Sequence, residues 1–114
     1  MTGVLILLFT SPVQHRNAEK ALSLAKAFSE AGDAVKVFLL GDGVYNGSNL
    51  FLSRFPDSAA GQLTELPSVN VAACTTCVKT RCVDLSPKVF EGGLEDLCEY
   101  VEQSEITISL TSEA

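Results

Sequence analysis

The chain has 114 residues, with 8 basic and 14 acidic side chains and a formal net charge of −6. This length predicts one domain over residues 1–114, and a hydrophobic fraction of 46% excludes a disordered chain. The acidic balance and the lack of a basic run argue against direct contact with nucleic acid or anionic membranes. The longest apolar run, Val4–Phe9, is far shorter than the ~20 residues of a membrane span. Because the first residues also lack the basic start of a secretory signal, we expect a cytoplasmic protein.

The first forty residues show the pattern strand, helix, strand. Residues 3–9 form a continuous apolar run, which is typical of a strand buried on both faces. Residues 14–31 carry apolar side chains at the spacing of one helix face, namely Ala18, Ala21, Leu22, Ala25 and Phe28. Residues 35–40 form a second apolar run. The short joints between these segments predict a right-handed crossover between parallel strands.

The rest of the chain continues the alternation. Residues 41–49 are expected to form a loop, and residues 50–66 stay ambiguous because Pro56 interrupts a helical pattern. Residues 69–73 predict a third strand, residues 92–103 a helix and residues 106–110 a last strand. We therefore predict an α/β three-layer sandwich of the flavodoxin or Rossmann kind, a mainly parallel sheet with helices on both faces. In such folds ligands lie beyond the carboxyl ends of strands, so residues 10–15, 41–49 and 74–82 are expected to line one crevice.

Three cysteines lie close together after the third predicted strand. Cys74 and Cys77 have the spacing C-x-x-C where a helical turn is expected to start, and Cys82 follows five residues later. Backbone N–H groups at a helix start favour a thiolate, and Lys79 and Arg81 add positive charge that would lower the pKa of a cysteine there. We predict Cys74 and Cys77 as the catalytic thiols, Cys82 as a possible resolving thiol, and the two cations as groups that tune the pKa.

Four chemistries compete for this cluster. One cysteine could carry a persulfide, or Cys74 and Cys77 could form a redox pair, although the Trp-Cys-Gly-Pro-Cys context of thioredoxin is absent. A zinc or iron–sulfur site would need Cys98, which falls on an apolar helix stripe and is expected to be core. Flavin binding is disfavoured because residues 10–15 lack a phosphate-binding glycine. We expect no metal and no organic cofactor.

Other polar residues and glycines fall on the loops that are expected to line the crevice. A histidine there could carry a proton, while glycines serve tight turns. The candidate pocket residues are Ser11, His15, Gly43, Tyr45 and Asn46.

Several segments together resemble the DsrE/DsrF/TusD-like family of small sulfur-transfer proteins. They are the first strand ending in Thr10-Ser11-Pro12, the strand that leads into Gly43-Val44-Tyr45, and the strand that ends in Cys74. The turn at residues 90–94 into the last helix also resembles the family. The order and distance of the Gly-Val-Tyr and cysteine segments carry most of the resemblance, which covers most of the chain.

The resemblance implies particular roles and an assembly. Cys74 matches the sulfur-carrying position, and many relatives have a second cysteine three residues later, as Cys77 is here. Cys82, preceded by Arg81, stands where glycine is usual, which leaves open a disulfide of Cys74 with either Cys77 or Cys82. The resemblance further implies a homo-oligomer, commonly a trimer or hexamer, with the cysteine near a subunit junction.

The leading hypothesis from the sequence is a sulfur-relay protein, a sulfurtransferase that carries sulfur as a persulfide on Cys74. It would take this sulfur from a donor protein and pass it to an acceptor protein thiol. The first alternative is a non-catalytic oligomeric module that binds a small ligand or regulates a partner. The second is a dithiol oxidoreductase that uses Cys74 and Cys77.

Overall fold

The computed structural model describes residues 2–111, and its centre is a five-stranded sheet in the order β4-β3-β2-β1-β5. Every neighbouring pair of strands is parallel. The strands are β1 (Gly3–Leu8), β2 (Ala34–Leu39), β3 (Val69–Cys74), β4 (Phe90–Gly92) and β5 (Ile106–Leu110). The helices are α1 (Asn17–Glu30), α2 (Asn49–Arg54), α3 (Ala59–Glu65), α4 (Thr75–Thr80) and α5 (Leu94–Gln103), with a 3-10 helix η1 at Gly41–Gly47.

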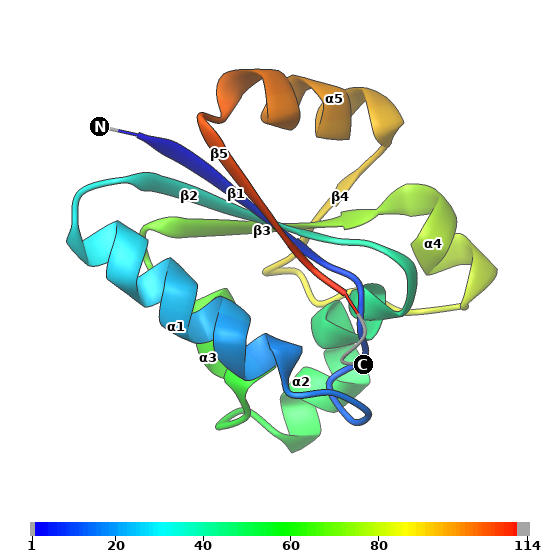
Figure 1. Ribbon diagram of the computed structural model, residues 1–114. Coiled ribbons are helices and arrows are strands. Elements are labelled where there is room, and N and C mark those ends of the chain that lie inside the picture. The colour runs from blue at the N-terminus through cyan, green and yellow to red at the C-terminus, as the bar shows by residue number, and fades with distance from the viewer. Residues whose placement is uncertain (1, 112–114) are drawn as a thin grey trace.

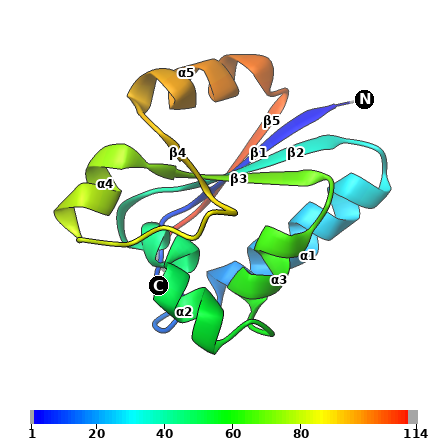
Figure 2. The ribbon, with the colours of Figure 1, turned by 180° about the vertical axis from the view of Figure 1, so that it is seen from behind.

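The helices lie on both faces of the sheet, which confirms the predicted α/β sandwich (Figure 1). Helices α1 and α3 cover one face, α5 covers the other, and α4 follows the carboxyl end of β3, as the view from behind also shows (Figure 2). Within residues 2–111, no helix combines the length and the apolar character needed to cross a bilayer.

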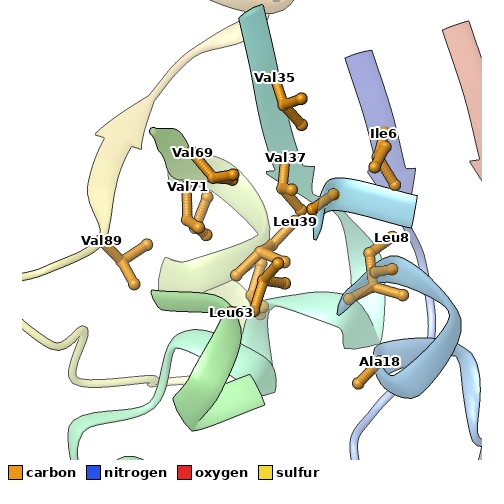
Figure 3. Close-up of a cluster of buried hydrophobic side chains, with 14 of the residues drawn as sticks. Ile6, Leu8, Ala18, Val35, Val37, Leu39, Leu63, Val69, Val71 and Val89 are labelled. Atoms are coloured by element: carbon orange, nitrogen blue, oxygen red, sulfur yellow. The ribbon is translucent and has the colours of Figure 1, made fainter. Parts of the chain in front are cut away.

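The larger core lies between the sheet and helices α1 and α3 (Figure 3). Alternate residues of three strands point into it, and the small side chains of α1 let that helix approach the sheet closely. Its buried members include Val4, Ile6, Leu8, Val35, Val37, Leu39, Val69, Val71, Ala18, Ala21, Ala25 and Leu63. The intervening residues Leu5, Phe38, Ala72 and Cys74 form a smaller core on the α5 face. Both faces of the central strands are therefore buried, as the continuous apolar runs predicted.

Strand β4 was not predicted from the sequence, which indicated only a turn at these residues. It has three residues, of which Phe90 and Glu91 are exposed, so it shows neither an apolar run nor an alternation. Its pairing with β3, which places Gly92 opposite Cys74, comes from the tertiary fold alone.

Helix α5 is rotated relative to the predicted stripe. Its contacts with the smaller core come from Leu97 and Tyr100, whose ring meets Phe38 edge-on at 5.9 Å between centroids. Cys98 is exposed, so the prediction that it belongs to the core is wrong. The predicted stripe was Leu94, Leu97, Cys98 and Val101. Leu97 packs against the core as predicted, but the helix turns Tyr100 toward the sheet and leaves the other three residues exposed.

The expected loop after β2 is instead the 3-10 helix η1, which folds back over the end of β1. The N–H of Gly43 donates to the carbonyl of Leu40 at 2.8 Å. A Cβ atom at Gly43 would lie 1.9 Å from the carbonyl oxygen of Leu8, well inside contact distance. This close approach requires glycine and holds η1 against the end of β1.

We expect Gly43→Ala to destabilise the fold by about 1–3 kcal/mol or more, because the backbone of β1 or η1 must move to admit the methyl group. Gly93→Ala is the matched control, since a Cβ there meets no atom within 4 Å, and it should cost less than about 1 kcal/mol. Urea unfolding of both variants measures the difference. Equal midpoints for the two variants would contradict the close approach.

Candidate functional site

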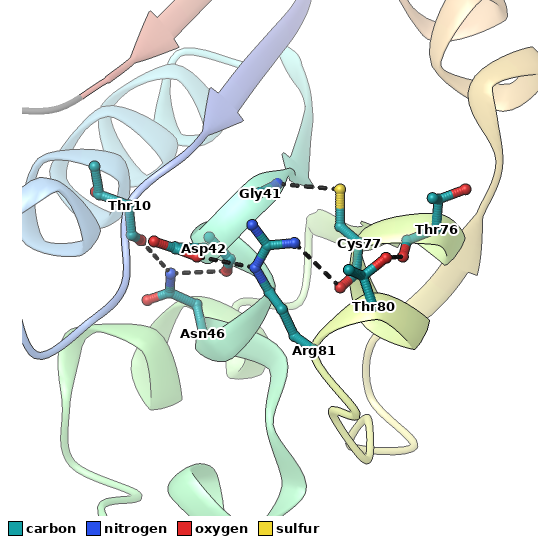
Figure 4. A network of polar contacts seen from close by, with 9 residues as sticks. Thr10, Gly41, Asp42, Asn46, Thr76, Cys77, Thr80 and Arg81 are labelled. Carbon is teal, nitrogen blue, oxygen red and sulfur yellow. Dashed lines mark hydrogen bonds and ion pairs between the residues drawn. The ribbon is translucent and has the colours of Figure 1, made fainter.

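The three segments that the sequence placed around one crevice meet at the carboxyl ends of β1, β2 and β3 (Figure 4). The Nδ2 of Asn46 donates to the carbonyl of Thr10 at 2.9 Å, which ties η1 to the end of β1. The backbone N–H of Gly41 donates to the Sγ of Cys77 at 3.3 Å, which ties η1 to α4. The three segments therefore meet at one edge of the sheet. They do not line one crevice, however, because the hollow that Ser11 and Tyr45 line includes none of residues 74–82.

Cys74 and Cys77 lie at the junction of β3 and α4. Cys74 is the last residue of β3 and the N-cap of α4, and only 5% of it is exposed. Cys77 lies in the first turn of α4, is partly buried, and packs against the smaller core that contains Cys74. Cys74 is the N-cap and Cys77 the third residue of α4, so their side chains lie over the same helical turn, and Cys74 helps to raise the pKa of Cys77. The C-x-x-C spacing thus brings together one buried and one half-buried sulfur.

Burial raises the pKa of Cys77 above its ordinary value, and three neighbours modify the effect. The Gly41 N–H lowers this pKa by stabilising the thiolate, contact with Cys74 raises it, and the positive charge of Arg81 lowers it. Desolvation is the largest of these effects, so the balance for Cys77 is opposite to the lowered pKa that the sequence suggested. At neutral pH Cys77 is therefore mainly a thiol.

Arg81 is held beside this thiol by Asp42, the second residue of η1. The Nε of Arg81 donates to the Oδ1 of Asp42 at 2.9 Å, and its Nη1 reaches the carbonyl of Cys77 at 3.5 Å. The ion pair raises the pKa of Arg81, so its charge is permanent. Lys79 is exposed on α4 and is not among the groups that shift the pKa of Cys77.

Sequence reasoning did not single out Gly41 and Asp42 as site residues. Both residues come directly after β2, at the same edge of the sheet as Arg81. This position, and the opposite charges of Asp42 and Arg81, could have indicated them from the sequence.

Cys82 lies beyond the other end of α4. It has a φ of 53° and takes the left-handed position of a Schellman motif. The N–H of Cys82 donates a hydrogen bond to the carbonyl of Lys79, and the N–H of Val83 donates to the carbonyl of Val78. Glycine suits this position best, which gives a backbone reason why glycine is usual there. The six residues of α4 lie between Cys74 and Cys82 and rise about 9 Å, while a disulfide spans less than about 7 Å between Cα atoms. Of the two disulfides left open, the structure favours Cys74 with Cys77.

Of the predicted pocket residues, some line one of two hollows and the others are buried in η1. Ser11 and Tyr45 line a hollow of about 420 Å³, together with Pro12, Val13, Gln14, Asp42, Ser48 and Phe51. The Oγ of Ser11 is buried and has no hydrogen-bond partner among residues 2–111. Gly43 and Asn46 are buried and shape η1. His15 lines a different hollow, between the start of α1 and helices α2 and α3.

Acidic and metal-binding side chains do not gather at the site. In the part of the chain that the structure describes, no group of three or more His, Cys, Asp or Glu side chains is placed to hold a metal ion. The site is therefore best described as a thiol pair with a backbone donor and an arginine beside it.

We expect alkylation to label the exposed Cys82 and Cys98 first, Cys77 more slowly and the buried Cys74 last. Labelling of Cys77 should rise about ten-fold per pH unit up to its raised pKa, because only the thiolate reacts. Arg81→Ala should slow it further, because the positive charge that lowers the pKa of Cys77 is lost, whereas Lys79→Ala should not. Peptide mass spectrometry over time measures each site. Labelling of Cys77 at neutral pH as fast as Cys82 would contradict the raised pKa.

Comparison with known proteins agrees with this fold. The model of the DsrE/DsrF-like family matches residues 3–110. The crystal structure of the YchN protein from E. coli superposes with a TM-score of 0.73 and 20% sequence identity, covering 96% of this chain and 100% of that one. A search of curated proteins found no match. Since the family match spans nearly the whole chain, this protein belongs to the DsrE/DsrF-like family.

Proposed function

We propose that this protein is a cytoplasmic sulfur-relay protein that holds sulfur as a persulfide on Cys74. The observation that carries the proposal is the pair of cysteines at the carboxyl end of β3, where the buried Cys74 lies one helical turn from Cys77. The Gly41 N–H and the charge of Arg81 favour a negative charge on the sulfur of Cys77. Membership of a family associated with sulfur relay, and the match of Cys74 to the sulfur-carrying position, support it.

The relay needs two exchanges between sulfur atoms and no cofactor. The Cys74 thiolate attacks the outer sulfur of a donor persulfide, so that a new sulfur–sulfur bond forms and the donor leaves as a thiolate. An acceptor thiolate then attacks the same outer sulfur and releases Cys74. Each step breaks one bond to that sulfur and forms another, so the protein undergoes no net oxidation.

The burial of Cys74 fits storage of a reactive sulfur. A persulfide on an exposed cysteine meets every thiol in solution, whereas Cys74 is only 5% exposed. The added sulfur extends the side chain by about 2 Å, the length of a sulfur–sulfur bond. The outer sulfur can therefore be offered to a docked partner while the inner sulfur stays within the protein.

Loading the reduced protein with a sulfur donor at neutral pH should add one sulfur atom, which mild reduction removes. Cys74→Ala should abolish this addition, and Cys77→Ala should retain it. The exposed Cys98→Ala variant is the matched control for labelling at accessible thiols. Intact and peptide mass spectrometry locates the sulfur. Absence of uptake in every form, or uptake lost only in Cys98→Ala, would refute the relay.

We also propose that the protein is a homo-oligomer, such as a trimer or hexamer, that uses the α5 side of the sheet. Three large apolar side chains are exposed there: Phe90 at 62%, Leu94 at 69% and Val101 at 45%. Exposed apolar groups of this size favour a protein interface. Because Gly92 pairs with Cys74 in the sheet, the start of α5 lies beside the thiol pair, so an interface there would place Cys74 near a subunit junction.

Leu94→Glu should shift the protein to a smaller species, because it places a charge in the proposed interface. Leu50→Glu is the control, since Leu50 is 65% exposed but lies on α2. Size-exclusion chromatography with light scattering gives the mass of each species. A monomeric wild-type protein, or dissociation by the Leu50 variant alone, would contradict this interface.

One observation favours a second candidate function, the binding of a small ligand. The 420 Å³ hollow beside Asp42 contains the buried Ser11 Oγ, which has no partner among the described residues. A buried hydroxyl without a partner costs free energy that a bound ligand would recover. If the thiols take up no sulfur, we propose that the protein acts as a binding module through this hollow.

A further inference from the structure

The position of Cys77 beside Cys74, in the first turn of α4, has a chemical consequence for any sulfur bound to Cys74. The second thiol belongs to the same small core as the first, and its Sγ is fixed by the Gly41 N–H at 3.3 Å. A sulfur–sulfur bond formed on Cys74 therefore lies next to a positioned thiol. Thiol–disulfide exchange requires only that a thiolate reach one of the two bonded sulfur atoms.

We propose that the protein has a second activity, the release of hydrosulfide from its own persulfide by attack of Cys77 on the inner sulfur of Cys74. This inference rests on the proposed function, because it needs a persulfide on Cys74. Cys77 loses its proton to solvent and its thiolate forms the Cys74–Cys77 bond, while the outer sulfur leaves as HS⁻. The two cysteines are oxidised to a disulfide, the outer sulfur is reduced, and no other oxidant is required.

The identity of the attacking cysteine follows from its position. Cys77 lies three residues from Cys74, in the same turn at the start of α4, whereas Cys82 lies beyond the far end of this six-residue helix, which rises about 9 Å. Cys98 is exposed on α5. Among residues 2–111, Cys77 is therefore the cysteine that can reach Cys74 without unfolding a helix.

The same surroundings determine how long the persulfide survives. Arg81, itself paired with Asp42, and Cys74 are the charged and titratable groups that face Cys77 from α4, η1 and β3, and Tyr100 of α5 shares its hydrophobic core. Burial raises the pKa of Cys77, so its thiolate is scarce at neutral pH. Attack by Cys77 is then slow at neutral pH, so the persulfide persists long enough to react with an acceptor thiol. Release should accelerate about ten-fold per pH unit until Cys77 ionises.

The test follows one batch of reduced protein after brief loading with inorganic polysulfide and rapid removal of the donor. Intact mass spectrometry follows the added sulfur, and a colorimetric assay follows sulfide. We expect the added sulfur to disappear as one equivalent of sulfide and a Cys74–Cys77 disulfide form. At about pH 9 the process should be roughly a hundred times faster than at pH 7, from the thiolate fraction.

Cys77→Ser should keep the added sulfur and release only background sulfide. Cys77→Ala should give the same result, because both variants lack the attacking thiol. Cys82→Ser is the matched control and should release sulfide like the wild type. A wild-type persulfide as long-lived as that of Cys77→Ser would overturn this inference and leave the relay intact, as would release that depends on Cys82. Absence of sulfur uptake even in Cys77→Ser would refute the relay itself.

Discussion

The close approach of η1 to the end of β1 is the constraint on which the candidate site depends. Gly43 lies where a Cβ would meet the carbonyl oxygen of Leu8 at 1.9 Å, so the chain after β2 turns back tightly over β1. That turn directs the Gly41 N–H toward Cys77 and places Asp42 within reach of Arg81. A looser connection would leave the same side chains at the same edge of the sheet, but without these contacts.

The thiol pair balances two opposing effects on sulfur. Burial disfavours the thiolate of Cys77, whereas the Gly41 N–H and Arg81 favour it, and burial prevails. A pair with a strongly ionised second cysteine would lose its persulfide as quickly as it formed. A protonated Cys77 beside a buried Cys74 instead suits a carrier that must hold sulfur until an acceptor arrives. The proposed relay and the proposed sulfide release are therefore alternative fates of one intermediate.

The parts of the fold predicted from sequence are those with a strong local pattern. The buried strands β1, β2 and β3 follow from continuous apolar runs, and α1 follows from its helical spacing of alanines. Strand β4 has three residues, two of them exposed, so no local pattern could reveal it. The orientation of α5 depends on the packing of Tyr100 against Phe38, a contact between residues 62 positions apart, and for this reason the position of Cys98 was predicted wrongly.

By itself, the sequence determined the α/β class, the edge at which three loops meet, and the cysteines that lie there, because these depend on strand order and on spacing along the chain. Only the tertiary structure decided that Cys74 is buried, that Cys77 receives a hydrogen bond from Gly41, and that Asp42 holds Arg81. The reason is physical: burial and electrostatic contacts depend on distances between segments that lie some thirty to forty positions apart in the chain, and the pKa of a thiol depends on those distances rather than on its neighbours in sequence.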